Sequence, residues 1–191
     1  DNPHEHLRFL QSRRMDMVKM RASEKNRAQA PSGIKNHPSF KAIMDTLNEH
    51  IDLIDQEMTD LIHQNPELKE KVAILQTVPG IGQVIATQLI TLMPEMGRMN
   101  QKQVASLAGL APHPNQSGQK EGYRKTRGGR RQIPVVLHMA AMSAARGKNK
   151  IADFYQHLIA RDKAPLVALT AVARKIIVIA NARLKSPPQS T

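Results

Sequence analysis

Apolar residues recur at intervals of three and four through most of the chain. This spacing gathers apolar side chains on one face of a helix and therefore predicts an all-α fold. Pro and Gly interrupt the pattern, most clearly between Ala30 and Ser39. The predicted helices cover residues 4–30, 39–61, 66–75, a segment from 83 onward, and residues 100–109, 132–146, 151–161 and 165–185.

The helix expected from Ser39 onward, where the serine is placed to cap it, has the most regular apolar stripe. Seven apolar residues follow at gaps of 4, 3, 4, 3, 4 and 3: Phe40, Met44, Leu47, Ile51, Ile54, Met58 and Leu61. Three unbroken heptads are typical of a coiled-coil seam, within a helical hairpin or between subunits. An amphipathic helix packed on its own domain would show the same stripe. The basic helix 4–30 is the expected antiparallel partner, because its charge complements the acidic flanks of the second helix.

Breaks in the pattern divide the chain into three parts. Residues 1–65 are expected to form a helical arm or coiled-coil linker, residues 66–185 a compact helical domain, and residues 186–191 a disordered tail. A long loop, residues 110–130, lies within the domain, and long loops of this kind are often functional. Its alternating residues are compatible with a short β-hairpin within 113–130.

Local signals mark the helix ends inside the domain. Asn100 and Gln103 are spaced as a capping-box-like start, and Gly109 stands where a left-handed residue closes a helix. Pro134 falls in the first turn of the helix 132–146, where a missing amide hydrogen costs nothing.

The segment VPGIG, residues 78–82, lies between two helical patterns. Glycines there can adopt the dihedral angles of a tight turn, and their amides can approach a phosphate closely. The next helix directs its partially positive N-terminus to the same place. These features predict a helix-hairpin-helix that binds a nucleic-acid backbone, with Val78 and Ile81 in the core; a purely structural turn is the alternative. The candidate binding residues are Gly80, Gly82 and Gln83.

The composition of the chain excludes several classes of protein. The chain has no Cys, which excludes disulfides and thiolate metal sites and fits a reducing cytoplasm. Aromatic residues make up only 3%, which argues against stacking of single-stranded bases. Arg174, Lys175 and Arg183 interrupt the most apolar segment, so neither a membrane span nor a membrane partner is expected. The chain begins with Asp1 rather than Met, which suggests a fragment of a longer protein.

Charge points to a polyanionic partner. The net charge is +12, and its densest part, residues 113–150, has nine Lys or Arg against one Glu. Such a distribution favours nucleic acid, and glycines at 118, 122, 128 and 129 would let this loop follow an irregular backbone. A solvated charge run is the alternative. The candidate phosphate ligands are Lys120, Arg124, Lys125, Arg127, Arg130 and Arg131.

Ser117 begins this basic segment, between Gln116 and Gly118. A serine hydroxyl is a weak nucleophile until a base or a metal activates it, so a turn residue is the simpler interpretation. Its position beside cations that could hold a scissile phosphate favours a catalytic role, with His113 as a candidate proton acceptor. The eight His residues are scattered, and no metal-ligating cluster is evident.

The chain resembles the C-terminal part of the DEDD-type bacterial insertion-sequence transposases, a family that includes the Piv-type DNA invertases. The resemblance covers residues 75–184 and rests on Pro-Gly-Ile-Gly, Ala-Gly-Leu-Ala-Pro, Ser-Gly, Gly-Gly-Arg and His-Met-Ala-Ala in that order. The segment from Leu7 to Arg27 also resembles the family's connecting coiled coil.

The resemblance implies a specific chemistry. The family's Ser-Gly serine, a nucleophile that becomes linked to DNA, maps onto Ser117, and its Gly-Gly-Arg maps onto residues 128–130. The family's magnesium-binding residues lie in an N-terminal domain that these 191 residues do not include, so no cofactor is expected in this part of the protein. Some members use a guide RNA, and these act as dimers that pair into tetramers.

Two hypotheses follow. The first is a DNA-binding, serine-containing recombinase domain that is inactive by itself. The second is a non-catalytic helix-hairpin-helix module that binds DNA or structured RNA.

Overall fold

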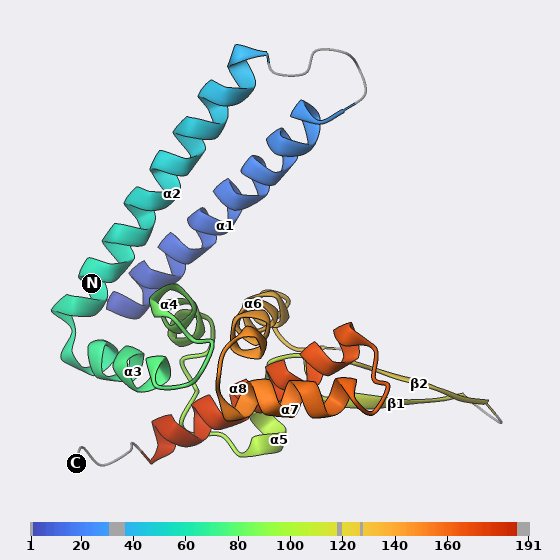
Figure 1. The fold of residues 1–191 in the computed structure, drawn as a ribbon. Coiled ribbons are helices and arrows are strands. Elements are labelled where there is room, and N and C mark those ends of the chain that lie inside the picture. The colour runs from blue at the N-terminus through green and yellow to red at the C-terminus, as the bar shows by residue number, and fades with distance from the viewer. Residues whose placement is uncertain (1, 31–36, 118–119, 127, 187–191) are drawn as a thin grey trace. The chain divides into compact units, whose positions relative to one another are not determined.

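A computed structural model describes residues 2–30, 37–117, 120–126 and 128–186, and for 112–117 and 120–126 it describes the backbone only. This part of the chain forms eight helices and one two-stranded antiparallel sheet (Figure 1). The predicted helical fold and the short β-hairpin are therefore both confirmed. Most of the tail predicted to be disordered lies outside the described residues. The elements are α1 (Pro3–Ala28), α2 (Pro38–Gln64), α3 (Pro66–Gln76), α4 (Gln83–Leu92), α5 (Gln101–Leu107), β1 (Pro112–Ser117), β2 (Lys120–Thr126), α6 (Ile133–Arg146), α7 (Lys150–Ile159) and α8 (Pro165–Lys185).

The chain divides into two compact units, Asp1–Pro66 (unit 1) and Glu67–Thr191 (unit 2). In unit 1, α1 and α2 lie side by side as an antiparallel hairpin (Figure 1). The heptad stripe is buried at Ile51, Ile54 and Met58 and half-buried towards the start of α2. This confirms the hairpin interpretation of the stripe. The N-cap is His37 rather than Ser39, because Pro38 occupies the first helical position and the His37 ring accepts the Ser39 amide.

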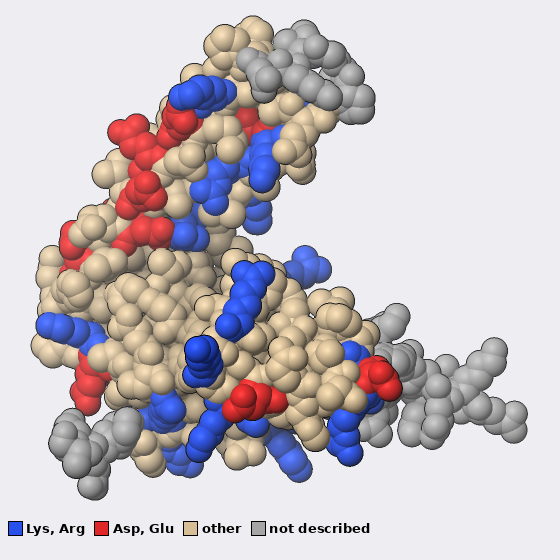
Figure 2. Space-filling model, in the orientation of Figure 1, with Lys and Arg blue, Asp and Glu red and all other residues tan. Residues whose placement is uncertain are grey.

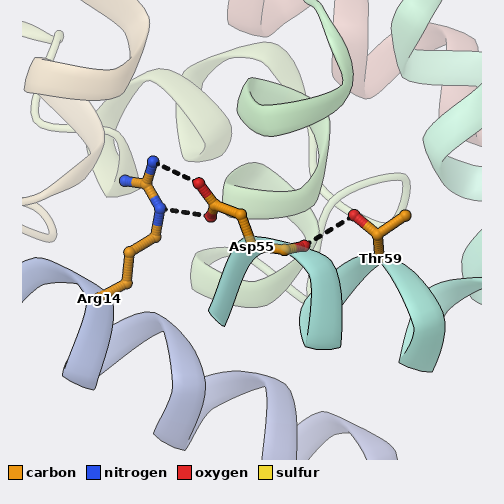
Figure 3. A network of polar contacts seen from close by, with 3 residues as sticks. All are labelled: Arg14, Asp55 and Thr59. Atoms are coloured by element: carbon orange, nitrogen blue, oxygen red, sulfur yellow. Dashed lines mark hydrogen bonds and ion pairs between the residues drawn. The ribbon is translucent and has the colours of Figure 1, made fainter. Parts of the chain in front are cut away.

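Opposite charges join the two helices of unit 1, as the sequence predicts. Arg14 donates two hydrogen bonds to the Asp55 carboxylate, at 2.5 and 2.9 Å, and Thr59 binds the Asp55 carbonyl oxygen at 2.8 Å (Figure 3). Arg21 donates to Asn48 at 2.9 Å. Figure 2 shows the acidic side chains gathered along one edge of this hairpin, with basic side chains beside them.

The core of unit 2 forms around α8, against which α5, α6 and α7 pack. The buried residues of α8 are Ala168, Val172, Ala173, Ile176, Ile177, Ala180 and Asn181. The alanines of α6 at 140, 141 and 144 are also fully or almost fully buried, as their small side chains allow close helix contact. Leu166 has the spacing of the apolar residues of α8, but it is 66% exposed in the first turn of that helix, before the first buried residue, Ala168.

Two further features of unit 2 bear on the sequence-based expectations. The capping box of α5 is present, with Asn100 and Gln103 each accepting the other's amide at 2.9 Å, and Gly109 has a φ of +69°. By length and composition alone, α8 could cross a membrane, the one such helix in the described part of the chain. Its seven buried residues are typical of a helix in the core of a globular unit.

Candidate nucleic-acid interface

The turn between α3 and α4 is tightly packed on the core of unit 2. Val78 and Ile81 are 1% and 4% exposed, which confirms their predicted place, and the Ile81 amide donates to the Val78 carbonyl at 3.0 Å. Gly80 has a φ of +87°, and a Cβ atom there would lie 2.3 Å from the Ala140 carbonyl oxygen and 2.8 Å from the Ala144 Cβ atom. Gly80 is therefore needed for contact with α6, a role that the sequence does not reveal.

Gly82 and Gln83 lie on the open side of the same turn. Gly82 is the exposed N-cap of α4, has extended backbone, and has no atom within 4 Å of where a Cβ would stand. No side chain caps α4, so its first amides face outward with the partial positive charge of a helix N-terminus. In the described part of the chain, α4 packs on α6 and makes no comparable contact with α3, which differs from a helix-hairpin-helix packed on itself.

One cation distant in sequence lies at this turn. Arg183 of α8 donates a hydrogen bond of 2.6 Å to the Thr77 hydroxyl, directly before the turn. Sequence reasoning missed it because it belongs to no local motif; only the packing of α8 brings it to the turn.

The predicted serine loop contains the β-hairpin. Ser117 ends β1 and pairs with Lys120, the first residue of β2, while His113 pairs with Lys125. The register is irregular between His113 and Asn115. The side chains of Ser117, Lys120, Arg124 and Lys125, and all of Arg127, lie outside the described residues, so their roles stay predictions.

The base of this hairpin is closed by glycine contacts. A Cβ atom on Gly129 would lie 2.3 Å from the Gly109 nitrogen, and one on Gly109 would lie 2.6 Å from the Gly128 carbonyl oxygen. Both Gly109 and Gly129 have positive φ. The Arg130 amide then donates to the Leu107 carbonyl oxygen at 3.0 Å. The two ends of the segment thus meet at a fixed point beside α5.

Arg130 and Arg131 have different surroundings. The Arg130 guanidinium donates to both carboxylate oxygens of Glu95, at 2.6 and 3.0 Å, and to the Leu92 carbonyl oxygen that ends α4. Arg131 is exposed and forms no ion pair within the part of the chain that the structure describes. The prediction that treats them as equivalent phosphate ligands does not anticipate this difference.

The segment that supplies Glu95 is itself held by α8. Asn181, 3% exposed, accepts the Gly97 amide at 2.9 Å and donates to the Met99 carbonyl oxygen at 2.8 Å. A Cβ atom on Gly97 would lie 3.1 Å from the Leu184 Cβ atom, so this segment lies directly on α8. A buried Asn in an apolar helix needs hydrogen-bond partners. Asn181 is therefore the sequence signal that could have indicated that α8 holds a neighbouring segment.

The positive charge belongs to unit 2. Its residues include 19 Lys and Arg against six Asp and Glu, a net charge of +13, whereas unit 1 has nine against ten. Figure 2 shows basic side chains spread over the visible face of unit 2, with few acidic ones among them. Within the described ranges, no group of three or more His, Asp or Glu could hold a metal ion. Unit 2 therefore has the electrostatics of a polyanion-binding surface.

Comparison with known proteins agrees with this picture. The chain is 27% identical over 142 residues to the "Pilin gene-inverting protein" of Moraxella lacunata, across 72% of this chain and 44% of that protein. It is 25% identical over 141 residues to the "Insertion element IS116 uncharacterized 44.8 kDa protein" of Streptomyces clavuligerus, across 73% and 34%. The corresponding insertion element IS110 protein of Streptomyces coelicolor is 26% identical over 150 residues, across 78% and 36%.

The chain spans less than half the length of each of these relatives. A family profile matches residues 72–156, a range that includes the turn at Gly80, the hairpin with Ser117, and the Arg130–Glu95 ion pair. Residues 72–156 of the chain therefore match the Transposase IS116/IS110/IS902 family.

Proposed function

We propose that this chain is the DNA-binding, serine-containing part of a DNA transposase or invertase. The observation that supports this most is that the family match, residues 72–156, coincides with the turn, the hairpin and the densest positive charge of the chain. The proposal therefore rests on a basic surface and a transposase-family match at the same residues. The activity of a whole protein that contains this chain is part of the proposal.

Binding would be directed at the phosphate backbone. The outward amides of α4 at Gly82 and Gln83 can donate to phosphate oxygens, and cations at the turn and on the hairpin add charge. Proposed ligands on the hairpin segment are Lys120, Arg124, Lys125, Arg127 and Arg131. Such contacts give affinity without reading base sequence.

Ser117 is the proposed nucleophile. Its hydroxyl oxygen attacks the phosphorus of a DNA phosphodiester, so an O–P bond to serine forms and the P–O bond to one sugar oxygen breaks. The serine proton passes to a general base, for which His113 is a candidate, and the departing sugar oxygen takes up a proton. One phosphoester replaces another, so the bond can later be returned to a different strand without hydrolysis.

Partners and cofactors of the longer protein complete the proposal. Magnesium would be held by residues outside this chain, as the family resemblance implies. Assembly into dimers or tetramers through the α1–α2 hairpin, and use of a guide RNA, follow from the family resemblance. No step above depends on either.

A second candidate is a binding module without chemistry. The tight packing of the α3–α4 turn on α6 favours it, since a rigid backbone platform is sufficient for holding a duplex. In this case the cations matter and Ser117 does not.

The test is DNA binding by the 191-residue chain across a range of salt concentrations. We expect sequence-independent binding whose logarithm falls linearly with the logarithm of salt, and Arg131→Ala should reduce that slope by roughly 0.9. Ser117→Ala, the matched control, should leave affinity and slope unchanged. An affinity that does not depend on salt would contradict the proposed interface. Strand cleavage by the chain alone with magnesium would contradict the need for further residues.

A further inference from the structure

We propose that Arg130 is a positioning residue that fixes the base of the β1–β2 hairpin through Glu95, and that it is not a phosphate ligand. This rests on the proposed function, in which the hairpin presents Ser117 to DNA. The pair Arg130–Glu95, with the Leu92 carbonyl oxygen, is called the clasp below.

Three of the five N–H donors of the Arg130 guanidinium are already engaged. Both terminal nitrogens donate to the Glu95 carboxylate, one to each oxygen, and one of them also donates to the Leu92 carbonyl oxygen. A planar guanidinium matches a carboxylate in this two-pronged geometry better than any other side chain does. Because the pair is neutral as a whole, it adds nothing to the attraction of a phosphate unless it opens first.

The clasp lies where the hairpin leaves the helices. Arg130 follows directly after Gly129, which is pressed against Gly109 at the other end of the same segment. Its amide is bound to Leu107 of α5, and its side chain reaches the end of α4. One residue thus ties the hairpin base to two helices.

The opposite side of the clasp is equally well held. Glu95 belongs to the segment between α4 and α5, and Asn181 of α8 brackets that segment at Gly97 and Met99. A continuous series of contacts therefore runs from the core helix α8 to the hairpin base. The exposed pair needs this support, because an isolated surface ion pair would hold the base weakly.

A small rotation of the hairpin base produces a large displacement of Ser117. β1 has six residues, so at about 3.3 Å per residue Ser117 stands roughly 17–20 Å from the base. A tilt of about 10° at the base would move Ser117 by about 3 Å over that length. Misplacement of a reacting group by about 1 Å can reduce a rate on the order of 100-fold. The clasp is thus placed where it has most influence on the serine.

The experiment uses Glu95→Gln, which keeps the size of the side chain and removes its charge. In Arg130→Ala, loss of a phosphate ligand would reduce the salt slope by roughly 0.9, whereas loss of a positioning residue leaves the slope unchanged. In Glu95→Gln the clasp is lost. The backbone order parameters of the cross-strand pair His113 and Lys125 should then fall, towards about 0.6 or lower, while those of α7 stay unchanged.

Two further variants complete the test. Arg130→Ala should lower the same order parameters, and Arg130→Lys, which keeps an ion pair with Glu95, should restore part of the loss; neither should change the salt slope. Order parameters that do not respond to Glu95→Gln and Arg130→Ala, or a salt slope reduced by roughly 0.9 in Arg130→Ala, would overturn the proposal. If the unaltered chain binds no DNA, the proposed function fails, whereas the order parameters still decide whether the clasp fixes the hairpin.

Discussion

Gly80→Ala is the substitution for which the structure gives the sharpest expectation. The new Cβ atom would lie 2.3 Å from the Ala140 carbonyl oxygen, and this oxygen belongs to helical backbone that cannot move aside cheaply. The φ of +87° is also unfavourable for any residue with a Cβ atom.

The free-energy costs of the two effects can be added to give the approximate loss of stability. A positive φ costs alanine about 1–2 kcal/mol, and overpacking a well-packed contact costs about 1–3 kcal/mol. Unit 2 should therefore lose about 2–5 kcal/mol of unfolding free energy. With a urea m-value of about 2 kcal/mol/M, the unfolding midpoint should fall by about 1–2.5 M.

Tyrosine fluorescence is the appropriate assay. The chain has two Tyr and no Trp, and both Tyr123 and Tyr155 belong to unit 2, so the signal reports the unfolding of that unit. Gly82→Ala is the matched control, since its Cβ would meet no atom within 4 Å and its φ is negative. Gly82→Ala should change the urea unfolding midpoint little. Equal effects of the two substitutions, or a Gly80→Ala midpoint close to that of the unaltered chain, would refute the packing argument.

Three other predictions follow from the contacts. In unit 1, a double-mutant cycle with Arg14→Ala and Asp55→Ala should give a coupling energy of about 1 kcal/mol, measured by urea unfolding with circular dichroism as the signal. Additive effects of the two substitutions would show that the bidentate pair contributes nothing. Asn181→Leu should destabilise unit 2 by about 1–3 kcal/mol, because the half-buried Gly97 amide and Met99 carbonyl lose their partners; a change below about 0.5 kcal/mol would contradict the role of Asn181 in holding this segment. Arg183→Ala should reduce the salt slope of DNA binding by roughly 0.9, because its guanidinium lies at the turn, whereas Arg161→Ala, an exposed control in the α7–α8 connection, should not; equal effects would remove the turn as the site of binding.

Periodicity and local chemistry predict the elements of this fold well. The heptad from Phe40 to Leu61 indicates a long helix and its packed face, and Asn100 with Gln103 marks the start of α5 because the capping box is complete within four residues. These features depend only on neighbours in the sequence, so they can be read without the fold. The same is true of Gly109, whose positive φ closes a helix locally.

Apart from the cap of α2, the features that the sequence does not reveal involve partners that are distant in sequence. Phosphate approach at Gly80 stays a prediction, and only the fold shows that its missing Cβ makes room for Ala140, sixty positions away. The sequence groups Arg130 with its neighbour Arg131, because nothing near it indicates that Glu95 will pair with it. Leu166 has the right spacing for burial, but whether a helix packs along its whole length depends on where its neighbours end.

The central claim is that Ser117 becomes joined to DNA, and a covalent adduct tests it most directly. The measurement uses a protein that contains this sequence together with the remaining length of its relatives, incubated with labelled substrate DNA and magnesium and then denatured. We expect a DNA–protein band that survives denaturation, a modified peptide that contains Ser117, and loss of both in Ser117→Ala while DNA binding persists. An adduct that remains in Ser117→Ala, or that maps to another residue, would contradict the account.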